Sequence, residues 1–424
     1  MDVLILGSGA REHALAWRLA RDEGVGRLRI APGNGGTPAV AETVPDLDIL
    51  DAASVARHAA RERYDLVVIG PEAPLAAGVA DALRGASVPT FGPDRAAARL
   101  ESSKAFAKEQ LRRAGVPTGA SAVFDDLEAA LAHLRAGAEL PVVKADWLAA
   151  GKGVVVPDSH AAAEDAIREL LRDAPPGARL LLEERLTGRE VSVFALVSDE
   201  SVIPLGAACD YKRLLDDDEG PNTGGMGAYS PVPWFGAAEV EDAVAATFEP
   251  IAWRMARDGT PYRGVLYAGL MLTEAGPMVL EFNARFGDPE AQVLLPLLDG
   301  ELSAVLLGVA TGDRSAMEGA VSLGDGAAVG VVIAAEGYPG DPVTGRPLLG
   351  ADPSSADDGG PLLCFHAATR RARDGSWEAT GGRVATVVGI GDDLASARET
   401  AYGGVAEVRL QGGQHRTDVG LREL

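Results

Sequence analysis

The chain has 424 residues, of which 47% are hydrophobic, and its formal net charge is −23. A chain of this length is too long for one core, and its acidity argues against nonspecific nucleic-acid binding. The apolar opening at residues 3–6 is too short for a signal peptide, no run is long enough to span a membrane, and two cysteines provide no disulfide framework. We therefore expect a cytoplasmic protein of several domains with no nucleic-acid or membrane partner.

The first hundred residues alternate apolar runs with helical stretches. Residues 3–6 and 66–69 are continuous apolar segments, which are typical of strands buried on both faces. Helical patterns follow at residues 14–21 and 75–84. This alternation predicts a doubly wound parallel sheet that binds its ligand at the carboxyl ends of the strands.

Two features lie at those strand ends. The loop Gly7–His13 can present backbone N–H groups to a phosphate, but Glu12 stands where a dinucleotide fingerprint requires its third glycine. NAD binding is therefore disfavoured. Glu72 follows the second strand, and a ligand contact and a carboxylate stabilised by a helix N-terminus are equally good interpretations of it.

Lysines are few and clustered in this chain. Among 39 basic residues the lysines are Lys104, Lys108, Lys144, Lys152 and Lys212. An acidic protein that binds ATP needs a locally basic site, so these lysines are candidates for phosphate contacts, although chance clustering and a surface position for Lys108 are alternatives. Lys144 ends a predicted strand at 141–144, and Lys152 lies in the glycine-containing loop 145–153, which is either a phosphate-covering loop or an ordinary hairpin.

The middle of the chain predicts further strands and one long helix. We expect strands at 180–184, 191–197, 201–205 and 264–272, and a helix over 237–257. The acidic run Asp216–Glu219 by itself predicts a solvated loop, whereas the glycine-rich segment after it permits close backbone approach to a ligand.

A strand that begins near Val279 carries Glu281 and Asn283 on one face, because side chains alternate along a strand. Two oxygen ligands at this spacing suit Mg²⁺, which takes few protein ligands and leaves other positions to water and phosphate. The strand at 264–272 has no carboxylate, so metal binding depends on this pair. An ordinary strand end with solvated charges is the alternative.

The last hundred residues predict a small α+β domain. Strands are expected at 327–335 and 383–389, and a helix at 392–402. We find no candidate chemistry in this part of the sequence and expect it to complete the cleft.

Five motifs together resemble one family. They are Gly-Ser-Gly-Ala-Arg-Glu-His at 7–13, Pro-Glu-Ala-Pro-Leu at 71–75, Lys-Ala-Asp with Ala-Gly-Lys-Gly at 144–153, Gly-Pro-Asn-Thr-Gly-Gly-Met-Gly-Ala-Tyr-Ser-Pro at 220–231, and Arg-Phe-Gly-Asp-Pro-Glu-Ala-Gln at 285–292. They resemble the phosphoribosylamine–glycine ligases, ATP-grasp enzymes of purine synthesis, over essentially the whole chain. One departure is Trp147, which stands where the family has glycine.

The resemblance implies three domains: a Rossmann-like substrate domain at 1–102, an ATP-grasp domain at 103–325 with a mobile subdomain at about 118–190, and a C-terminal α+β domain at 326–424. It implies ATP-binding residues Lys104, Lys144, Lys152, Glu183, Glu184, Leu186 and Glu190. It implies substrate-binding residues Gly9, Arg11, Glu72, Asp210, Gly225, Met226 and Arg285. Arg285, Lys144 and Asp210 would be catalytic, with Mg²⁺ or Mn²⁺ on Glu281 and Asn283.

The sequence therefore predicts ATP-dependent joining of glycine to 5-phosphoribosylamine through glycyl phosphate, by a protein that we expect to be a monomer. The alternatives are another ATP-grasp carboxylate–amine ligase or carboxylase, an NAD-dependent oxidoreductase, and a nucleotide-binding module without catalysis. Glycine-dependent ADP release distinguishes the first alternative, cofactor titration the second, and turnover the third.

Overall fold

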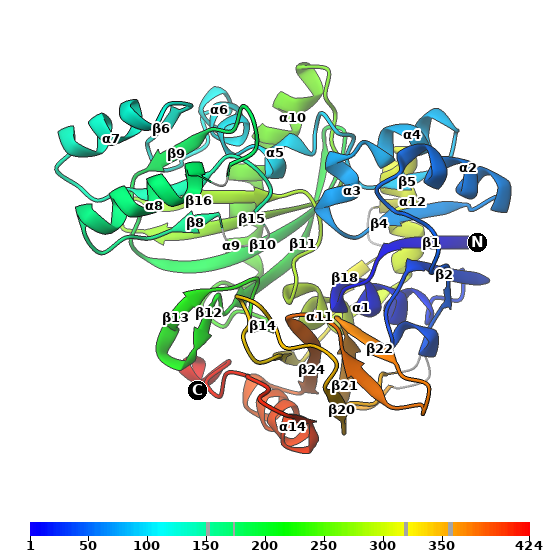
Figure 1. The fold of residues 1–424 in the computed structure, drawn as a ribbon. Coiled ribbons are helices and arrows are strands. Elements are labelled where there is room, and N and C mark those ends of the chain that lie inside the picture. The colour runs from blue at the N-terminus through cyan, green and yellow to red at the C-terminus, as the bar shows by residue number, and fades with distance from the viewer. Residues whose placement is uncertain (150–152, 173, 318–320, 355–358) are drawn as a thin grey trace.

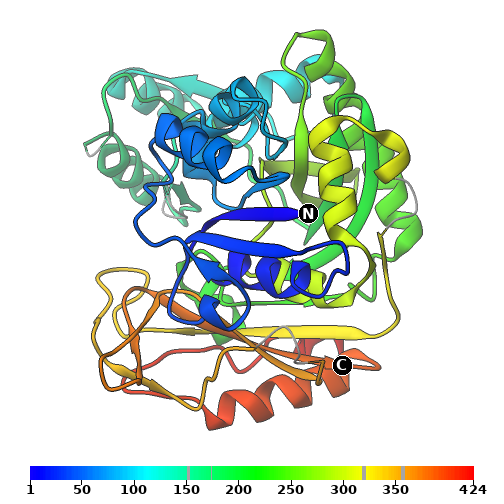
Figure 2. The same cartoon turned by 90° about the vertical axis from the view of Figure 1, so that its right-hand side faces the viewer.

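The computed structural model describes residues 1–149, 153–172, 174–317, 321–354 and 359–424 (Figure 1). Its main sheets are a five-stranded sheet near the N-terminus, a four-stranded sheet in the following segment, and a central eight-stranded sheet. Figure 2, which faces the N-terminal strands, shows them above the C-terminal helix. In the described part of the chain no helix is both long and apolar enough to cross a membrane.

The N-terminal sheet is parallel throughout, as predicted, with strand order β3-β2-β1-β4-β5. Its strands are β1 (Asp2–Gly7), β2 (Arg27–Pro32), β3 (Glu42–Thr43), β4 (Leu66–Ile69) and β5 (Thr90–Phe91). Its helices are α1 (Ala10–Leu19), α2 (Ala52–Glu62), α3 (Glu72–Ala76) and α4 (Val79–Gly85). The strand order reverses between β1 and β4, so the ends of these two strands form the crevice where ligands of such sheets bind.

Two predicted helix boundaries were wrong. Helix α1 begins at Ala10, before the predicted start at residue 14, because the Glu12 carboxylate accepts the N–H of the preceding Gly9 at 2.7 Å and caps the helix. The helix predicted at 75–84 is divided into α3 and α4 at Gly78, whose φ of 83° breaks the helical path.

The four-stranded sheet forms a separate lobe (Figure 1). Its strand order is β6-β9-β7-β8, with β6 (Ser121–Phe124), β7 (Val142–Ala145), β8 (Val154–Val155) and β9 (Leu180–Glu183). Helices α7 (Leu127–Ala136) and α8 (His160–Arg172) pack against it around a small core that includes Leu134 and Ile167. We call this lobe, residues 118–183, the lid.

The central sheet joins two parts of the chain that the sequence predicted as separate domains. Its antiparallel order is β16-β15-β10-β11-β14-β19-β24-β21. The strands are β10 (Arg189–Ser198), β11 (Ser201–Asp210), β14 (Gly227–Ser230), β15 (Arg263–Thr273), β16 (Gly276–Asn283), β19 (Ala327–Ala334), β21 (Leu362–His366) and β24 (Arg383–Gly391). Because β14 pairs with β11 on one side and β19 on the other, the C-terminal strands continue the ATP-grasp sheet.

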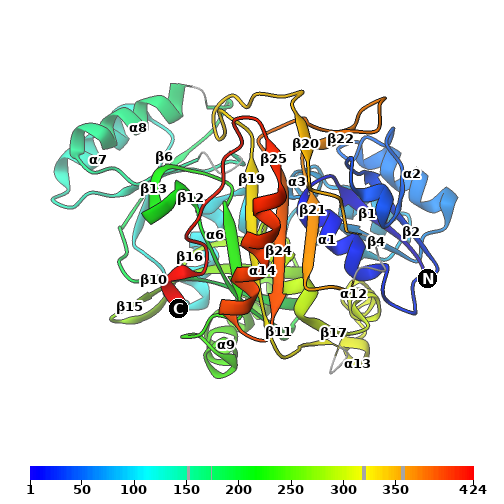
Figure 3. The same ribbon diagram turned by 90° about the horizontal axis from the view of Figure 1, so that it is seen from below.

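Helices cover this sheet. The predicted helix at 237–257 is one continuous helical segment in three parts, α9 (Ala237–Ala243), a π-helical turn (Val244–Phe248) and α10 (Glu249–Arg257). Near the sheet also lie α5 (Arg99–Ser102), α6 (Lys104–Ala114), α11 (Glu290–Leu294), α12 (Leu302–Thr311) and α13 (Arg314–Met317). The C-terminal helix α14 (Leu394–Glu407) lies against β19 and β24 (Figure 3).

A second four-stranded sheet, in the order β22-β23-β20-β25, belongs to the C-terminal part. It contains β20 (Pro347–Leu349), β22 (Thr369–Arg371), β23 (Trp377–Ala379) and β25 (Arg409–Leu410).

The free cysteines Cys209 and Cys364 are both buried.

Two buried histidines join the N-terminal and C-terminal parts. The His366 backbone N–H donates to His13 Nδ1 at 2.9 Å, and neither imidazole is exposed to solvent. Burial and the neighbouring His366 lower the pKa of His13 to about 3. His13 is therefore neutral in the folded protein at every pH where an unfolded histidine begins to take up a proton.

This predicts a loss of stability in mild acid. Because the folded pKa of His13 lies below the unfolded value near 6.5, the unfolded state binds the extra proton as the pH falls below about 6.5. Because of His13, the free energy of unfolding should decrease by about 1.4 kcal/mol when the pH is lowered from 7.5 to 5.5. His13→Asn retains an acceptor and cannot titrate, so urea unfolding at the two pH values should differ less for it. The exposed His415→Asn is the control, and an equal change in pH dependence for both variants would contradict the assignment.

Candidate active site

A cavity of about 1000 Å³ lies where the N-terminal crevice, the lid, the central sheet and the C-terminal part meet. The predicted site residues that line it are Arg11, Glu72, Lys104, Lys144, Glu183, Glu184, Leu186, Glu190, Asp210, Glu281, Asn283 and Arg285. These residues are separated by up to 274 positions in the sequence (285 − 11), and the fold brings them to one cavity. The volume is at the upper end of typical small-molecule sites, which suits two or three substrates together.

Strand β16 presents the predicted metal ligands. Glu281 and Asn283 line the cavity, as the predicted alternation expects, and Phe282 between them is buried in the core and reaches the cavity wall as well. Burial raises the pKa of Glu281, but Lys104, Lys212, Lys144 and Arg285 together outweigh it and hold the pKa below its usual value. No donor in the described part of the chain hydrogen-bonds this carboxylate, so an ionised oxygen ligand remains available in the cavity.

This donor set fits Mg²⁺. The Asn283 side-chain oxygen accepts a long hydrogen bond of 3.3 Å from Arg285, and its second lone pair is available. Within the described ranges there is no cluster of three or more histidine, cysteine or acidic side chains arranged to enclose a metal. A site of one carboxylate and one amide suits a cation that keeps water and phosphate ligands.

Two of the predicted phosphate-binding lysines lie in the cavity. Lys104 begins helix α6, where Ser103 is the N-cap and accepts the Phe106 N–H at 3.2 Å. Lys144 lies on β7, one residue before its end, and is 6% exposed. Lys152, the third predicted lysine, lies outside the described residues.

The loop after β7 is anchored at its start. Asp146 accepts hydrogen bonds from Ser103 Oγ at 3.0 Å and from the Ala105 N–H at 2.9 Å, which attaches the loop to the beginning of α6. Trp147 packs against the lid core and lines the cavity, and it is not among the non-glycine residues with positive φ. The freedom of the family's glycine is therefore not required at this position.

Glu183, the last residue of β9, is buried and paired with two lysines. Its side chain is 1% exposed and pairs with Lys108 Nζ at 2.5 Å and Lys144 Nζ at 2.8 Å. The surface alternative for Lys108 was wrong, because this lysine is buried and lines the cavity. Glu184 and Leu186 follow Glu183 along the cavity wall.

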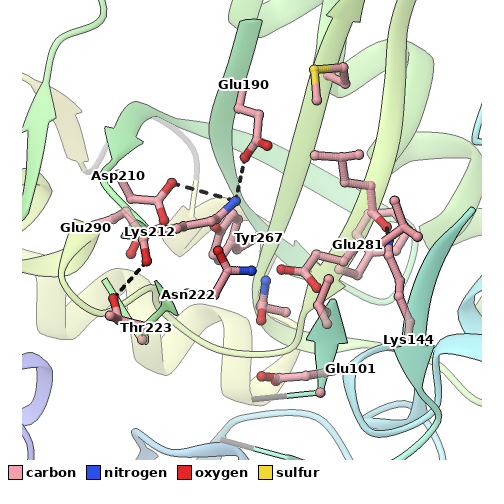
Figure 4. A pocket seen from close by; sticks show the side chains of 18 of the residues that line it. Glu101, Lys144, Glu190, Asp210, Lys212, Asn222, Thr223, Tyr267, Glu281 and Glu290 are labelled. Carbon is pink, nitrogen blue, oxygen red and sulfur yellow. Dashed lines mark hydrogen bonds and ion pairs between the residues drawn. The ribbon is translucent and has the colours of Figure 1, made fainter. Parts of the chain in front are cut away.

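Asp210, Lys212 and Glu190 form a second charged group, at the opposite side of the cavity from Lys144 (Figure 4). Lys212 Nζ lies 2.6 Å from Glu190 Oε2 and 3.9 Å from Asp210 Oδ1. Burial raises the pKa of Asp210 to about 7, and the nearby Glu290 and Glu190 add to the rise against the opposing effect of Lys212. Asp210 is therefore poised to exchange a proton near neutral pH.

Arg285 is held by two carboxylates. Its guanidinium lies 3.0 Å from Glu101 Oε1 and 3.3 Å from Glu72 Oε2. Glu101 also accepts the Ala284 N–H at 2.8 Å. Glu72 begins α3 and also contacts a cavity arginine, and its contact with a ligand stays a prediction. The pairing fixes the direction of the guanidinium before any ligand binds.

Glu12 explains why the glycine loop does not fit a dinucleotide. A Cβ at Gly70 would lie 2.2 Å from Glu12 Oε1, and one at Gly7 would lie 2.4 Å from Glu12 Cγ. The carboxylate thus fills the space above the loop and already accepts the Gly9 N–H that a phosphate would use. Arg11 Nε pairs with Glu12 at 2.5 Å, and Arg11 reaches the cavity.

Three predicted substrate residues do not line the cavity: Gly9, Gly225 and Met226. Gly225 has a φ of 108°, and a Cβ there would lie 2.4 Å from Pro289 Cδ. Met226 is fully buried. These residues shape the backbone behind the cavity wall, and their direct contact with a ligand stays a prediction.

The acidic run Asp216–Glu219 was expected to be solvated, but the end of the chain binds it. Asp218 Oδ1 lies 2.9 Å from Arg416 Nη1, and Asp216 Oδ2 accepts from Thr417 Oγ1 at 2.5 Å. The guanidinium of Arg416 also lies over the ring of Tyr211, 4.5 Å from its centroid. The run forms the tip of the hairpin of β12 (Arg213–Leu215) and β13 (Glu219–Asn222), which leads from Asp210 to the glycine-rich segment.

The sequence analysis missed several cavity residues, which are Glu101, Tyr267, Asp288, Glu290, Tyr338 and Arg383. Lys108 and Lys212, which the rarity of lysine had marked as candidates, also line the cavity. Arg383 pairs with Asp288 at 3.0 Å and donates to the Gly224 carbonyl at 2.6 Å, from a strand with no distinguishing motif. The C-terminal part thus completes the cleft with a charged side chain, beyond the expected passive role.

The comparisons with known proteins agree with this geometry. Family models of phosphoribosylglycinamide synthetase match residues 1–101 (N domain), 102–291 (ATP-grasp domain) and 328–422 (C domain). Phosphoribosylamine–glycine ligases of Streptomyces coelicolor and Caulobacter vibrioides are 49% and 46% identical, each covering 100% of this chain and 99% of the relative.

Among solved structures, phosphoribosylamine–glycine ligase of Thermotoga maritima has a TM-score of 0.83 at 32% identity and covers 99% of this chain and 100% of its own. The biotin carboxylase domain of Hydrogenobacter thermophilus 2-oxoglutarate carboxylase, solved with MgADP and bicarbonate, has a TM-score of 0.70 at 15% identity over 98% of this chain and 91% of its own. This second likeness shows the fold alone.

The lid, the central sheet and the charged cavity between them define an ATP-grasp protein. Within that class, the family matches span nearly the whole chain and the relatives exceed 45% identity. The chain belongs to the phosphoribosylglycinamide synthetase family.

The C-terminal contact to the acidic hairpin yields a prediction. Arg416→Met should lower the free energy of unfolding by about 3 kcal/mol, because it removes a fully buried cation and leaves Asp418, at 2.6 Å, without its positively charged partner. Arg422→Met is the matched control, since Arg422 pairs with the same Asp218 but is 53% exposed, and its loss should be about 0.5 kcal/mol or less. Chemical denaturation measures both, and similar losses would contradict a special role for Arg416.

Proposed function

We propose that this chain joins glycine to 5-phosphoribosylamine and converts ATP to ADP and phosphate, a step of purine synthesis. The observation that carries the proposal is the cavity itself, in which Lys104 and Lys144 face an ionised Glu281 in a chain of net charge −23. The family membership and the names of the full-length relatives support the choice of substrates.

The chemistry requires activation of a carboxylate. Glycine's carboxylate resists attack by an amine because oxide would have to leave. In the proposed first step a glycine carboxylate oxygen attacks the γ-phosphorus of ATP, the bond to the bridging oxygen breaks, and ADP leaves. In the second step the amine of phosphoribosylamine attacks the carbonyl carbon of glycyl phosphate, phosphate leaves, and the amine loses a proton.

The side chains have positional and electrostatic roles in this proposal. Lys104 and Lys144 hold the ATP phosphates, and Arg285, oriented by Glu72 and Glu101, stabilises charge on the acyl phosphate. Asp210 accepts the amine proton, a role that its pKa of about 7 supports. Glu184, Leu186 and Glu190 line the part of the cavity assigned to the nucleoside.

Glu281 and Asn283 are the residues that would hold Mg²⁺, with Mn²⁺ as an alternative of similar coordination. When bound, the cation neutralises phosphate charge and polarises the transferring phosphoryl group. The ionised carboxylate that lines the cavity is the feature that supports this assignment.

The first test is a measurement of ADP release with and without glycine and phosphoribosylamine. Release that requires both supports the proposal. Bicarbonate-dependent release would favour an ATP-grasp carboxylase, and release with another amino acid would favour a different carboxylate–amine ligase. Absence of turnover with bound ATP would favour a nucleotide-binding module.

Glu281→Gln should reduce turnover by about a hundredfold or more, because it removes the charge of the metal ligand while preserving its size. The change should also raise the Mg²⁺ concentration required for half-maximal ATP binding, measured by calorimetry. Glu274→Gln, on the exposed turn of the same hairpin, is the control and should behave as wild type. Near-normal turnover of Glu281→Gln at ordinary Mg²⁺ would refute the metal assignment.

Isotope transfer tests the glycyl phosphate intermediate. Glycine labelled with ¹⁸O in its carboxylate should deliver one labelled oxygen to each phosphate released in a productive turnover. Mass spectrometry of the phosphate measures this transfer. Unlabelled phosphate would overturn the acyl-phosphate route while leaving the overall reaction in place.

A further inference from the structure

Lys108 lies in the wall of the cavity, where the two connections of the lid meet. It follows Lys104 by four residues on α6, so the two lysines lie on the same face of the helix. Lys108 Nζ contacts Glu183 Oε1 and Thr118 Oγ1, both at 2.5 Å. Thr118 is at the entry to the lid and Glu183 is the last residue of its exit strand, β9.

The two lid connections are packed closely at this point. The Thr118 hydroxyl donates to the Val279 carbonyl of β16 at 2.6 Å. A Cβ at Gly119 would lie 3.2 Å from Glu183 Oε1, so a side chain there would require a small shift of the Glu183 carboxylate. Lys108 therefore contacts the entry and the exit of the lid directly. Through Thr118 it is also linked to β16, the strand that carries Glu281 and Asn283.

The same carboxylate reaches the phosphate-binding lysine. Glu183 Oε2 lies 2.8 Å from Lys144 Nζ, and Lys144 also lies 3.4 Å from the Leu280 carbonyl. Two buried lysines thus share one buried glutamate, so these three side chains together carry a net positive charge. Burying three charges is costly, and such a cluster is usually no more stable than apolar packing, so stability alone does not account for it.

We propose that Lys108 is a positioning residue for ATP that acts through Glu183 on Lys144. Lys108 satisfies one oxygen of Glu183 and so leaves Lys144 only partly neutralised and directed at the cavity. Without Lys108, Glu183 pairs with Lys144 alone, the cluster becomes neutral, and Lys144 is drawn away from the phosphates. The inference rests on the proposed role of Lys144 at the phosphates of ATP.

The test is a double-mutant cycle on ATP affinity. Lys108→Met should weaken Mg·ATP binding about tenfold, measured by calorimetry, although the Lys108 ammonium is directed at Glu183 and Thr118. In a Lys144→Met background the same change should have less than about a twofold effect, because the residue through which Lys108 acts is gone. Kinetically, Lys108→Met should raise the KM for ATP more than it lowers kcat.

Matched variants separate this from a general effect of charge or folding. Lys108→Arg keeps the charge and should restore most of the affinity. Arg112→Met removes a positive charge from the exposed face of the same helix, where Arg112 is 72% exposed and pairs with Glu109, and should leave ATP affinity unchanged. If Lys108→Met fails to fold, Lys108→Gln, which is neutral but still donates a hydrogen bond, carries the same cycle.

Equal losses from Lys108→Met in the wild-type and Lys144→Met backgrounds would overturn the proposal, as would unchanged ATP affinity of Lys108→Met. An equal loss in Arg112→Met would also overturn it. ATP binding needs neither glycine nor phosphoribosylamine. A wild-type protein without glycine-dependent ADP release would therefore refute the proposed function and leave this test valid.

Discussion

The site depends on keeping positive charge available inside a strongly acidic protein. Lys144, Lys212 and Arg285 each have carboxylate partners in the cavity wall, and these partners are Glu183, Glu190 with Asp210, and Glu101 with Glu72. Each ion pair weakens the attraction of the cation for a phosphate. It also holds the cationic side chain in one orientation, whereas a solvated side chain would be free to move. The cavity is thus a set of preoriented cations, with Glu281 ionised among them.

This arrangement requires distant parts of the chain to meet with little tolerance. The Glu12 carboxylate closes the space above Gly7 and Gly70, and Arg383 reaches from β24 to Asp288. The N-terminal sheet, the central sheet and the C-terminal strands therefore contribute to one surface. A change in the relative position of these parts would break the charge-assisted hydrogen bonds that orient these side chains, since such bonds form only at short distances.

Local features of the sequence predicted much of this structure. The apolar runs predicted β1, β4 and β19, the alternation around Phe282 placed Glu281 and Asn283 in the cavity, and the rarity of lysine pointed to Lys144. What local reasoning missed depends on contacts between distant residues. Arg416 binding the acidic hairpin, Arg383 facing Asp288, and β14 pairing with β19 have no signal in their own neighbourhoods.

Strand β14 has a consequence for how the molecule can be divided. One edge of β14 pairs with β11 and the other with β19. The backbone N–H and C=O groups on both edges therefore have hydrogen-bond partners only when both parts of the chain are present. A fragment ending before β19 would carry an open sheet edge, and the excised C-terminal piece would carry the complementary one. The C-terminal segment is therefore not an independent module, and two such fragments made separately have the edges needed to recombine by strand addition.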